Sequence, residues 1–424
     1  MSFMKKSAAA LVLTGVAAAT STALAAGFQL TEQSSLGAGR AYAGAGIVGD
    51  DLSAVHYNPA GMTLLEGTRF QAGGVWIGLN ADYSSDISGE SENGRLKGQM
   101  IPAGYVTHQV NDQIWLGFAM TVPFGMGTEY SKDWEGADRG TNAKIYTFDM
   151  NPNIAWKVSD FLSIGGGISV QYAKAELGMG LHGMGHGKVE ADSWDWGFNL
   201  GVMISPTDKL RFGLAYRSSI EHDAEGDLKL SGMNSMLSVL EGQNFDMTTS
   251  IETPDTVMLT GTWEATDKLR LSGLIRWANW SDFKELNLKN EIPSGLSSLS
   301  PAIQSFSNLS IENDWQDTWL FSVGADYKIN SAFTVRGGIA YETSPIDDQS
   351  TRMAVIPDTD RLWLSLGASW YATKDLQFDV GATYLMGVGD KDLYSDTKSH
   401  GGKKIGEYDS LDAYLLGVQM QYRF

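Results

Sequence analysis

Alternation of apolar with polar or small residues recurs from about Thr68 to the C-terminal Phe424, and it limits the possible fold more than any other feature of this sequence. The last stretch shows the alternation most clearly. Its two faces are, in turn, Tyr414, Leu416, Val418, Met420, Tyr422 and Phe424, and Gly417, Gln419, Gln421 and Arg423. Successive side chains of a β-strand point to opposite faces. An apolar face with aromatic ends, opposite a polar or small face, is typical of a strand in a membrane β-barrel.

Short polar connections alternate strictly with long ones along the chain. The short ones lie at 110–112, 158–160, 205–208, 265–267, 329–331 and 372–374, and the long ones near 82–97, 128–142, 178–188, 227–244, 287–314, 343–356 and 389–407. Antiparallel strands with turns at one rim and loops at the other produce this pattern. The segments between the connections number about fourteen, an even number as single-chain barrels require. The sequence therefore predicts an all-β membrane protein whose residues 68–424 form an antiparallel barrel of about fourteen strands.

The first 25 residues have the pattern of a cleaved signal peptide. Lys5 and Lys6 are followed by small apolar residues, and Ala23-Leu24-Ala25 forms an A-x-A cleavage site, so we expect the mature chain to begin at Ala26. An exported barrel of this kind is expected in the bacterial outer membrane. The chain contains no cysteine, which excludes disulfides and thiolate chemistry. Its net charge of −19 argues against binding to nucleic acid.

Residues 26–67 have neither strand-like nor helical apolar spacing, and they are rich in Gly, Ala and Ser. Barrels of eight strands are filled by their own side chains, whereas those of 16–18 strands enclose an aqueous channel, so a barrel of about fourteen strands needs a plug or serves as a pore. We therefore predict that these residues form a hatch inside the lumen.

Pro123, Gly125 and Gly127 interrupt the third predicted strand. Proline cannot donate to the hydrogen-bond ladder, and within a sheet it belongs at an edge or a bulge. Two interpretations remain open: the wall kinks or opens there, or the strand ends at Thr121 and a loop follows. An opening would let a hydrophobic solute pass sideways from the lumen into lipid.

One long connection carries an apolar pattern. Leu230, Met233, Met236, Leu237 and Leu240 recur at helical spacing, which predicts a short amphipathic helix at the rim. Either this helix packs on neighbouring loops or its Met/Leu face contacts a hydrophobic ligand.

Other motifs point to no chemistry. His182 and His186 lie four residues apart, but in a Gly- and Met-rich loop that makes a metal site improbable, and no nucleophile–base motif is present. We predict no metal, no cofactor and no enzymatic activity.

Five motifs give the chain a resemblance to the FadL family, the outer-membrane transporters of long-chain fatty acids and other hydrophobic compounds. They are GFQLTEQSSLGAGRAYAGAGIVGDD, YNPAG, LAYRSS, WANWSDF and IPDTDRLWLSLGASW, and the resemblance covers essentially all of the mature sequence. It implies passive transport through a fourteen-stranded barrel with a movable hatch and an exit at a kink in strand three. Phe28 would then be the N-terminal pocket residue, Asn58, Pro59 and Ala60 the hatch motif, Gly125 the kink, and Glu342 the acidic residue that faces it.

The chain departs from that family where its best-known members hold the fatty-acid head group with basic side chains. Met179 and Ile311 stand at the matching positions, and Lys174 and Arg217 are possible substitutes if they face inward. An uncharged or aromatic hydrocarbon is therefore an alternative ligand, and a general diffusion porin is a less favoured function. The expected partners are the hydrophobic ligand, outer-membrane lipids and, through Phe424, the barrel-assembly machinery.

Overall fold

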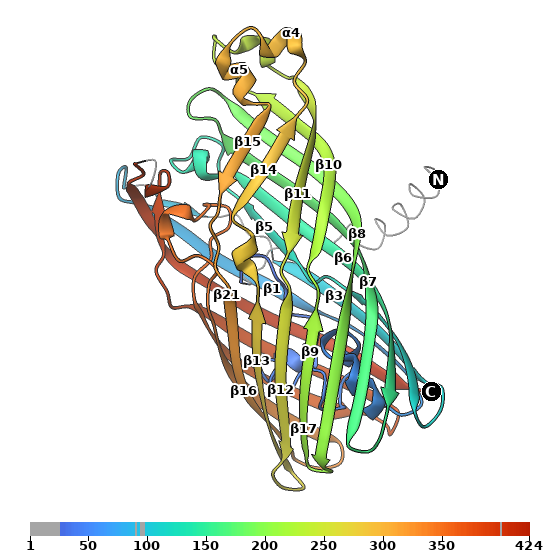
Figure 1. Ribbon diagram of the computed structural model, residues 1–424. Coiled ribbons are helices and arrows are strands. Elements are labelled where there is room, and N and C mark those ends of the chain that lie inside the picture. Colours follow the sequence, from blue (N-terminus) through green and yellow to red (C-terminus); the bar gives the residue numbers. More distant parts are fainter. Residues whose placement is uncertain (1–25, 90, 94–97, 399–400) are drawn as a thin grey trace.

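A closed antiparallel β-barrel forms the body of the protein in the computed structural model, which describes residues 26–89, 91–93, 98–398 and 401–424 (Figure 1). The predicted signal peptide, residues 1–25, lies outside the described residues. The first and last strands pair with each other, from Arg69↔Arg423 to Ser85↔Gly406, and this pairing closes the sheet. The strand segments are β1 (Thr68–Ser85), β2 (Ser91–Asn93), β3 (Gln99–Gln109), β4 (Ile114–Thr121), β5 (Gly125–Glu129), β6 (Asn142–Lys157), β7 (Leu162–Gly180), β8 (His186–Thr207), β9 (Leu210–Arg217), β10 (Ile220–Ser231), β11 (Asn244–Thr253), β12 (Thr256–Glu264), β13 (Leu269–Ala278), β14 (Glu285–Asn290), β15 (Asn308–Glu312), β16 (Thr318–Lys328), β17 (Phe333–Glu342), β18 (Arg361–Tyr371), β19 (Leu376–Gly387), β20 (Asp392–Tyr394) and β21 (Lys404–Arg423).

These segments make up the fourteen barrel strands that the sequence predicts. Seven strands are continuous, and seven consist of two segments in line, namely β2/β3, β4/β5, β9/β10, β11/β12, β13/β14, β15/β16 and β19/β20. Helical pieces are short: α2 (Ser35–Ala38), α3 (Ala54–Tyr57), α4 (Ser294–Ser297), α5 (Pro301–Ser305), and the 3-10 turns η1 (Pro59–Leu64), η2 (Ala137–Arg139), η3 (Ser238–Leu240), η4 (Trp280–Asp282) and η5 (Gln349–Thr351). Within the described ranges, none of them has the length and apolarity to cross a membrane.

Alternation places apolar side chains on the outside of the wall. In β21, Tyr414, Leu416 and Val418 are each more than half exposed, whereas Leu415 and Gln419 face the lumen and are buried. The same pattern recurs around the barrel, which therefore presents an apolar exterior of the kind that lipid requires.

The connections follow the predicted alternation, with one rim of short turns and an opposite rim of long loops that carries α4 and α5 (Figure 1). Two expectations about the loops are wrong. The link predicted at 178–188 shrinks to five residues, because β7 and β8 pair as far as Gly180↔His186. The helix predicted over Leu230–Leu240 does not form. Leu230 belongs to β10 instead, and only η3 is helical, because pairing of β10 with β11 absorbs the start of the segment.

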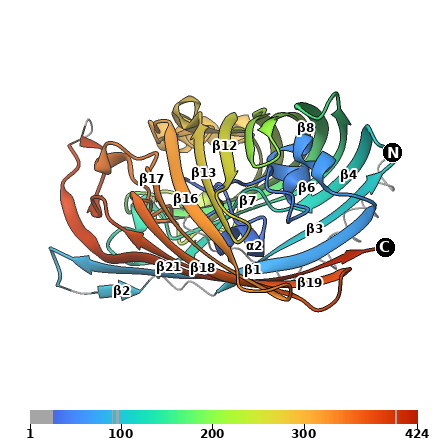
Figure 2. The same ribbon diagram turned by 90° about the horizontal axis from the view of Figure 1, so that it is seen from below.

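The segment predicted as a hatch lies inside the ring of strands, toward the short-turn rim (Figures 1 and 2). It contacts the wall at positions without side chains: a Cβ on Gly367 would lie 2.8 Å from the Cα of Gly39. A buried ion pair also holds it, because Arg40, which pairs with Asp50 of the same segment at 2.7 Å, lies 3.4 Å from Asp326 of β16. The lumen is thus occupied by chain that is bonded to the wall on several sides.

Candidate functional site

Phe28 lies at the centre of a cluster of aromatic rings. Its ring is 1% exposed, and its centroid lies 4.7 Å from that of Trp280, 5.8 Å from that of Trp315, and 6.0 Å from those of Phe124 and Phe283. We call these five residues the aromatic box. Three of the four contacts are edge-to-face, a favoured arrangement for aromatic pairs.

The four rings around Phe28 come from segments that interrupt the strands of the wall. Phe124 lies between β4 and β5, Trp280 and Phe283 lie between β13 and β14, and Trp315 lies between β15 and β16. A continuous strand would alternate its side chains between lipid and lumen, so each break frees a residue to turn toward Phe28. Gly27 completes the packing: its φ is +66°, and a Cβ there would lie 2.5 Å from the Trp315 ring.

The same interruption in strand three changes the wall next to the box. Pairing between β3 and β4 ends at Gly104↔Met120, and β5 pairs with β6 on its other side. Backbone groups of the hatch pair with the free strand edge at the break from inside the lumen. Leu30 N–H donates to the Pro123 carbonyl at 2.8 Å, and Gly125 N–H donates to the Phe28 carbonyl at 2.9 Å. The hatch thus continues the ladder where the described part of β3 does not.

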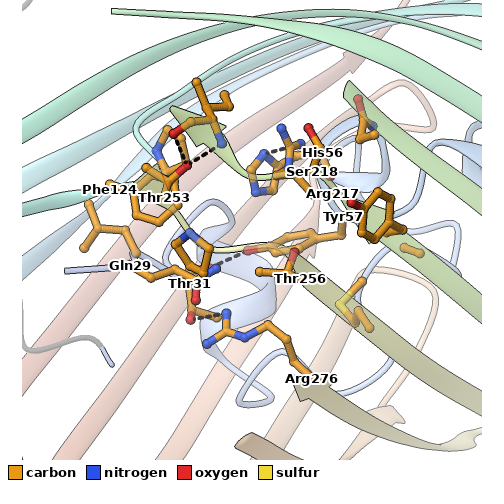
Figure 3. Close-up of a pocket in the computed structure, with 18 of the residues that line it drawn as sticks. Gln29, Thr31, His56, Tyr57, Phe124, Arg217, Ser218, Thr253, Thr256 and Arg276 are labelled. Carbon is orange, nitrogen blue, oxygen red and sulfur yellow. Dashed lines mark hydrogen bonds between the residues drawn. The ribbon is translucent and has the colours of Figure 1, made fainter. Parts of the chain in front are cut away.

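A small cavity of about 50 Å³ lies between these hatch residues and the opposite wall (Figure 3). Its lining is mixed and includes the polar residues Gln29, Thr31, His56, Arg217 and Arg276, together with Pro123 and Phe124 of the strand-three break. The Arg217 guanidinium faces inward, where it donates to the His56 carbonyl at 3.1 Å and lies 3.5 Å from the Asp149 carboxylate. Its charge is therefore already matched.

A larger cavity of about 700 Å³ opens among the long loops. Met179 and Ile311 line it, so the two positions where head-group bases were expected do face one cavity. The other lining residues are Asp138, Arg139, His182, Lys284, Glu285, Ser310, Glu312, Asp314, Met353, Asp396 and Thr397. Five carboxylates thus face two permanently cationic side chains, which gives this cavity a net negative lining.

The remaining ligand-binding candidates do not converge on this cavity. Lys174 shares its strand face with the exposed Ile168 and Val170, and its Nζ pairs with Glu190 at 2.5 Å, so it lies on the outer surface. Leu237 and Leu240 are buried among the loops, whereas Met236 is 79% exposed. Met233 is half-buried and packs against the same apolar cluster as the two leucines.

The predicted hatch motif is fastened to the wall. The Asn58 side-chain amide donates to the carbonyls of Val202 at 3.1 Å and Leu214 at 3.4 Å, while its Oδ1 accepts from Ala60 N–H. A Cβ on Gly201 would lie 2.1 Å from that Oδ1, so the wall needs glycine at this contact. Pro59 and Ala60 start η1 and are buried against strands β6 to β8.

A buried charge cluster lies beside the first hatch residues. Glu342 pairs with Arg276 at 2.7 Å and lies 3.6 Å from Arg361, which in turn is 3.5 Å from Asp358. The cluster also binds the hatch, because Arg276 donates to the Thr31 hydroxyl at 2.8 Å.

The hatch adds its own carboxyl to this cluster. Glu32 is 1% exposed, and burial, with a smaller contribution from repulsion by Glu342, raises the pKa of its carboxyl to about 7. In the same surroundings, burial raises the pKa of the Asp358 carboxyl to about 6.

Sequence reasoning identified Phe28 and Glu342 but missed most of their partners. Trp280, Phe283, Asp358 and Arg361 stand inside the WANWSDF and IPDTDR motifs, which were noted only as points of resemblance. Aromatic residues at predicted strand breaks are a signal that would have found Phe124 and Trp315.

Known proteins resemble this chain over nearly all of its length. The family described as "Outer membrane protein transport protein (OMPP1/FadL/TodX)" matches residues 16–424. Outer membrane protein P1 of Haemophilus influenzae is 30% identical over 479 aligned residues, which cover 99% of this chain and 100% of the relative. The long-chain fatty acid transport protein of Escherichia coli is 29% identical, with 96% of this chain and 97% of the relative covered.

Solved structures share the barrel fold. A FadL homologue of Pseudomonas aeruginosa superimposes with a TM-score of 0.82 at 23% identity, covering 94% of this chain and 100% of that one. The toluene transporter TbuX of Ralstonia pickettii gives a TM-score of 0.69 at 18% identity, covering 92% and 98%. The protein is thus a fourteen-stranded barrel of the bacterial outer membrane, and it belongs to the OMPP1/FadL/TodX family of outer membrane transport proteins.

Proposed function

We propose that the protein carries hydrophobic compounds passively across the outer membrane and that the segment from Ala26 to Leu30 is its gate. The observation that supports this proposal is the position of Phe28. A chain segment that places one ring in a box of four others occupies the site that an apolar ligand would take. A compound that enters the box must displace this ring and the backbone bonded to Pro123 and Gly125.

Only the first part of the hatch is proposed to move. Asn58 and Arg40 tie the later residues to the wall through hydrogen bonds and the buried ion pair of Arg40 with Asp326, and breaking such a pair is costly. Residues 26–30 depend instead on ring packing and a few backbone bonds. Asn58, Pro59 and Ala60 therefore act as the fixed base against which the gate opens.

Release is proposed to run sideways, between β3 and β5. The ladder between β3 and β4 stops at Gly104↔Met120, and hatch residues occupy the edge of β5 next to the break. When that segment leaves, the edge loses its partner and an apolar solute can pass from the box to the lipid. Downward release toward the short-turn rim is disfavoured because the rest of the hatch fills the lumen there.

The charges favour uncharged ligands over fatty-acid anions. Arg217 and Arg276, the arginines that line the inner cavity, lie against Asp149 and Glu342, respectively. The outer cavity carries more carboxylates than basic groups, and Met179 supplies no charge. A carboxylate ligand would thus meet repulsion at the entrance and no unmatched guanidinium among these arginines. Relatives named as fatty acid transport proteins and neighbours named as toluene transporters make both ligand classes relevant to the test.

Uptake into proteoliposomes tests the function and the ligand class together. We expect the protein to accelerate entry of an uncharged aromatic hydrocarbon and of a long-chain alcohol more than that of the fatty acid of equal length. Hydrophobic transport would be refuted if all three compounds entered the proteoliposomes no faster than they enter liposomes without protein. Large, steady ion conductance in planar bilayers would instead favour a general diffusion porin, which the occupied lumen argues against.

A disulfide across the break tests the lateral route. Cysteines at Ala103 and Thr121 would extend the β3–β4 ladder by one pair, and we expect oxidation to lower uptake several-fold and reduction to restore it. The matched control places cysteines at Val106 and Phe118, which already face each other in the ladder. Full uptake with the first disulfide completely formed would exclude this exit.

A further inference from the structure

Aromatic residues on the outer face of the wall pair with aspartates of the neighbouring strand. The five pairs are Tyr172–Asp192, Tyr216–Asp255, Trp277–Asp317, Tyr341–Asp360 and Tyr384–Asp412. In the last three pairs the indole N–H or the hydroxyl donates to the carboxylate at 2.9, 2.6 and 2.8 Å, respectively. Each aromatic residue lies on the face of its strand that carries exposed apolar side chains, so the pairs face outward.

One register unites the five pairs. The aspartate always stands two residues before the residue that faces the aromatic ring in the ladder, as Asp360 does before Leu362, which faces Tyr341. In four pairs the carboxylate also accepts a backbone N–H from three or four residues after the aromatic residue. These donors are Ser219, Ser281, Ser344 and Gly387. We call this arrangement the aromatic–aspartate clasp.

A clasp joins the strand that runs toward the rim of long loops to the strand that returns from it. Hydrogen bonds to a charged acceptor are roughly twice as strong as those between neutral groups. The carboxylate also resists entry into hydrocarbon, whereas Tyr and Trp favour the interface between lipid and water. The clasp therefore holds the two strands of a hairpin together at the lipid boundary.

Five of the seven hairpins that end in long connections have a clasp, and the two that lack it are neighbours. In the β4–β6 hairpin Met120 faces Met150, and Phe148 stands where the aspartate would be. In the β1–β3 hairpin the corresponding position is Gly98. β3 pairs with β4, so the two hairpins form one continuous sector of the wall, and the strand-three break falls within it.

The β1–β3 hairpin has the aromatic half of a clasp. Trp76 lies on the outer face and faces Met100, two residues after Gly98. A Cβ on Gly98 would lie 2.5 Å from the Trp76 Nε1 atom. An aspartate at position 98 would therefore bring its carboxylate to the indole N–H, as Asp317 does at Trp277.

We propose that the clasps keep five hairpins closed at the lipid boundary, and that the missing clasps of the β1–β3 and β4–β6 hairpins let the wall yield in that sector, which directs the released solute to the strand-three break. The clasp aspartates are positioning residues: they touch no solute, and they determine which part of the wall can open. This inference rests on the proposed lateral release.

Gly98→Asp tests the proposal because it installs a clasp in the sector that lacks one. Amide exchange of residues 98–103 should slow by about tenfold or more, the factor that corresponds to one hydrogen bond to a charged group. Uptake of an uncharged aromatic hydrocarbon into proteoliposomes should fall several-fold. Gly98→Ala is the matched control, since it adds the same Cβ beside Trp76 without a carboxylate, and it should change neither rate.

Two results with Gly98→Asp would overturn the proposal. Slower exchange with uptake at the unsubstituted rate would show that a clasp does not direct release. The same exchange and uptake in the aspartate and alanine variants would show that the carboxylate forms no clasp.

Tyr341→Phe tests an existing clasp, and it keeps the proposal open to refutation if Gly98→Asp fails to fold. The substitution removes only the hydroxyl that donates to Asp360. Exchange of residues 360–364 should rise by about tenfold or more. Uptake should stay the same, because the ladder between β17 and β18 is continuous there. Tyr327→Phe, at an outward position without a clasp, is the control, and equal exchange in the two variants would overturn the clasp.

The two proposals fail in different ways. If the unsubstituted protein does not speed hydrocarbon uptake but the exchange rates respond as expected, the transport function alone is refuted. If uptake is normal and no substitution in a clasp changes exchange, the clasp alone is refuted.

Discussion

Phe28→Ala is the substitution that should shift the gate most. The ring is 1% exposed and has four aromatic neighbours with centroids within 6.0 Å. Replacing a buried Phe by Ala in a packed core costs about 3–5 kcal/mol. Because the ring leaves the box only when the segment from Ala26 to Leu30 is released, this loss falls on the closed state. At about 1.4 kcal/mol per tenfold change, the released population rises by two to three and a half orders of magnitude, about 10²- to 4 × 10³-fold.

Amide hydrogen exchange of residues 27–34 measures that shift, with mass spectrometry of the peptides from folded protein. The rate of amide exchange should rise by the same factor, as long as the closed state remains the more populated one. Ligand affinity gives a second reading, since the apparent Kd equals the intrinsic Kd divided by the fraction of open protein. Fluorescence of the Trp280 and Trp315 indoles, which line the box, should therefore respond at lower ligand concentration than in the unsubstituted protein.

Phe161→Ala is the matched control, because this phenylalanine is 53% exposed near the short-turn rim and has no part in the box. It should leave both readings unchanged. The gating argument would be refuted if Phe28→Ala, with normal heat-modifiable folding, left the exchange of residues 27–34 and the ligand affinity as they are in the control.

Three further substitutions address the base of the hatch, its first turn and the entrance. Asn58→Ala removes the donors to two wall carbonyls, which should cost about 1–3 kcal/mol and make brief conductance openings in planar bilayers about 10- to 100-fold more frequent; an unchanged record would argue against the anchor. Gly27→Ala puts a Cβ 2.5 Å from the Trp315 ring at a φ of +66°, so exchange should rise as for Phe28→Ala, and unchanged exchange would mean that the first turn adapts freely. Met179→Lys adds a cation to the outer cavity and should raise the ratio of fatty-acid uptake to alcohol uptake. Met236→Lys, at an exposed position, should leave this ratio unchanged. The same ratio in both variants would exclude selection by charge in the outer cavity.

Period-two alternation is a local property, and for that reason the barrel was predictable. Each strand carries its own apolar face, and each turn its own polar residues, so the strand number and the two unlike rims follow without knowledge of any long-range contact. The presence of a segment inside the lumen was predictable by exclusion, because residues 26–67 lack strand character and a lumen of this size needs filling.

Orientation and strand extension were decided by pairing across the sheet. Lys174 was left as an inward-facing possibility, but the register of β7 puts it on the outer face with Ile168 and Val170. The predicted helix over Leu230–Leu240 was wrong because β10 continues through its first residues, and helical spacing of apolar residues does not report a partner strand.

The sequence by itself thus determined the barrel, its topology and the segment that enters the lumen. Only the tertiary structure decided what that segment contacts. The aromatic box joins Phe28 to rings from three strand interruptions, and the charge cluster joins Glu32 to Glu342 and Asp358 across more than 300 residues. No spacing along the chain encodes those contacts, because the closure of the wall and the breaks in its ladder set the distances between residues from different strands.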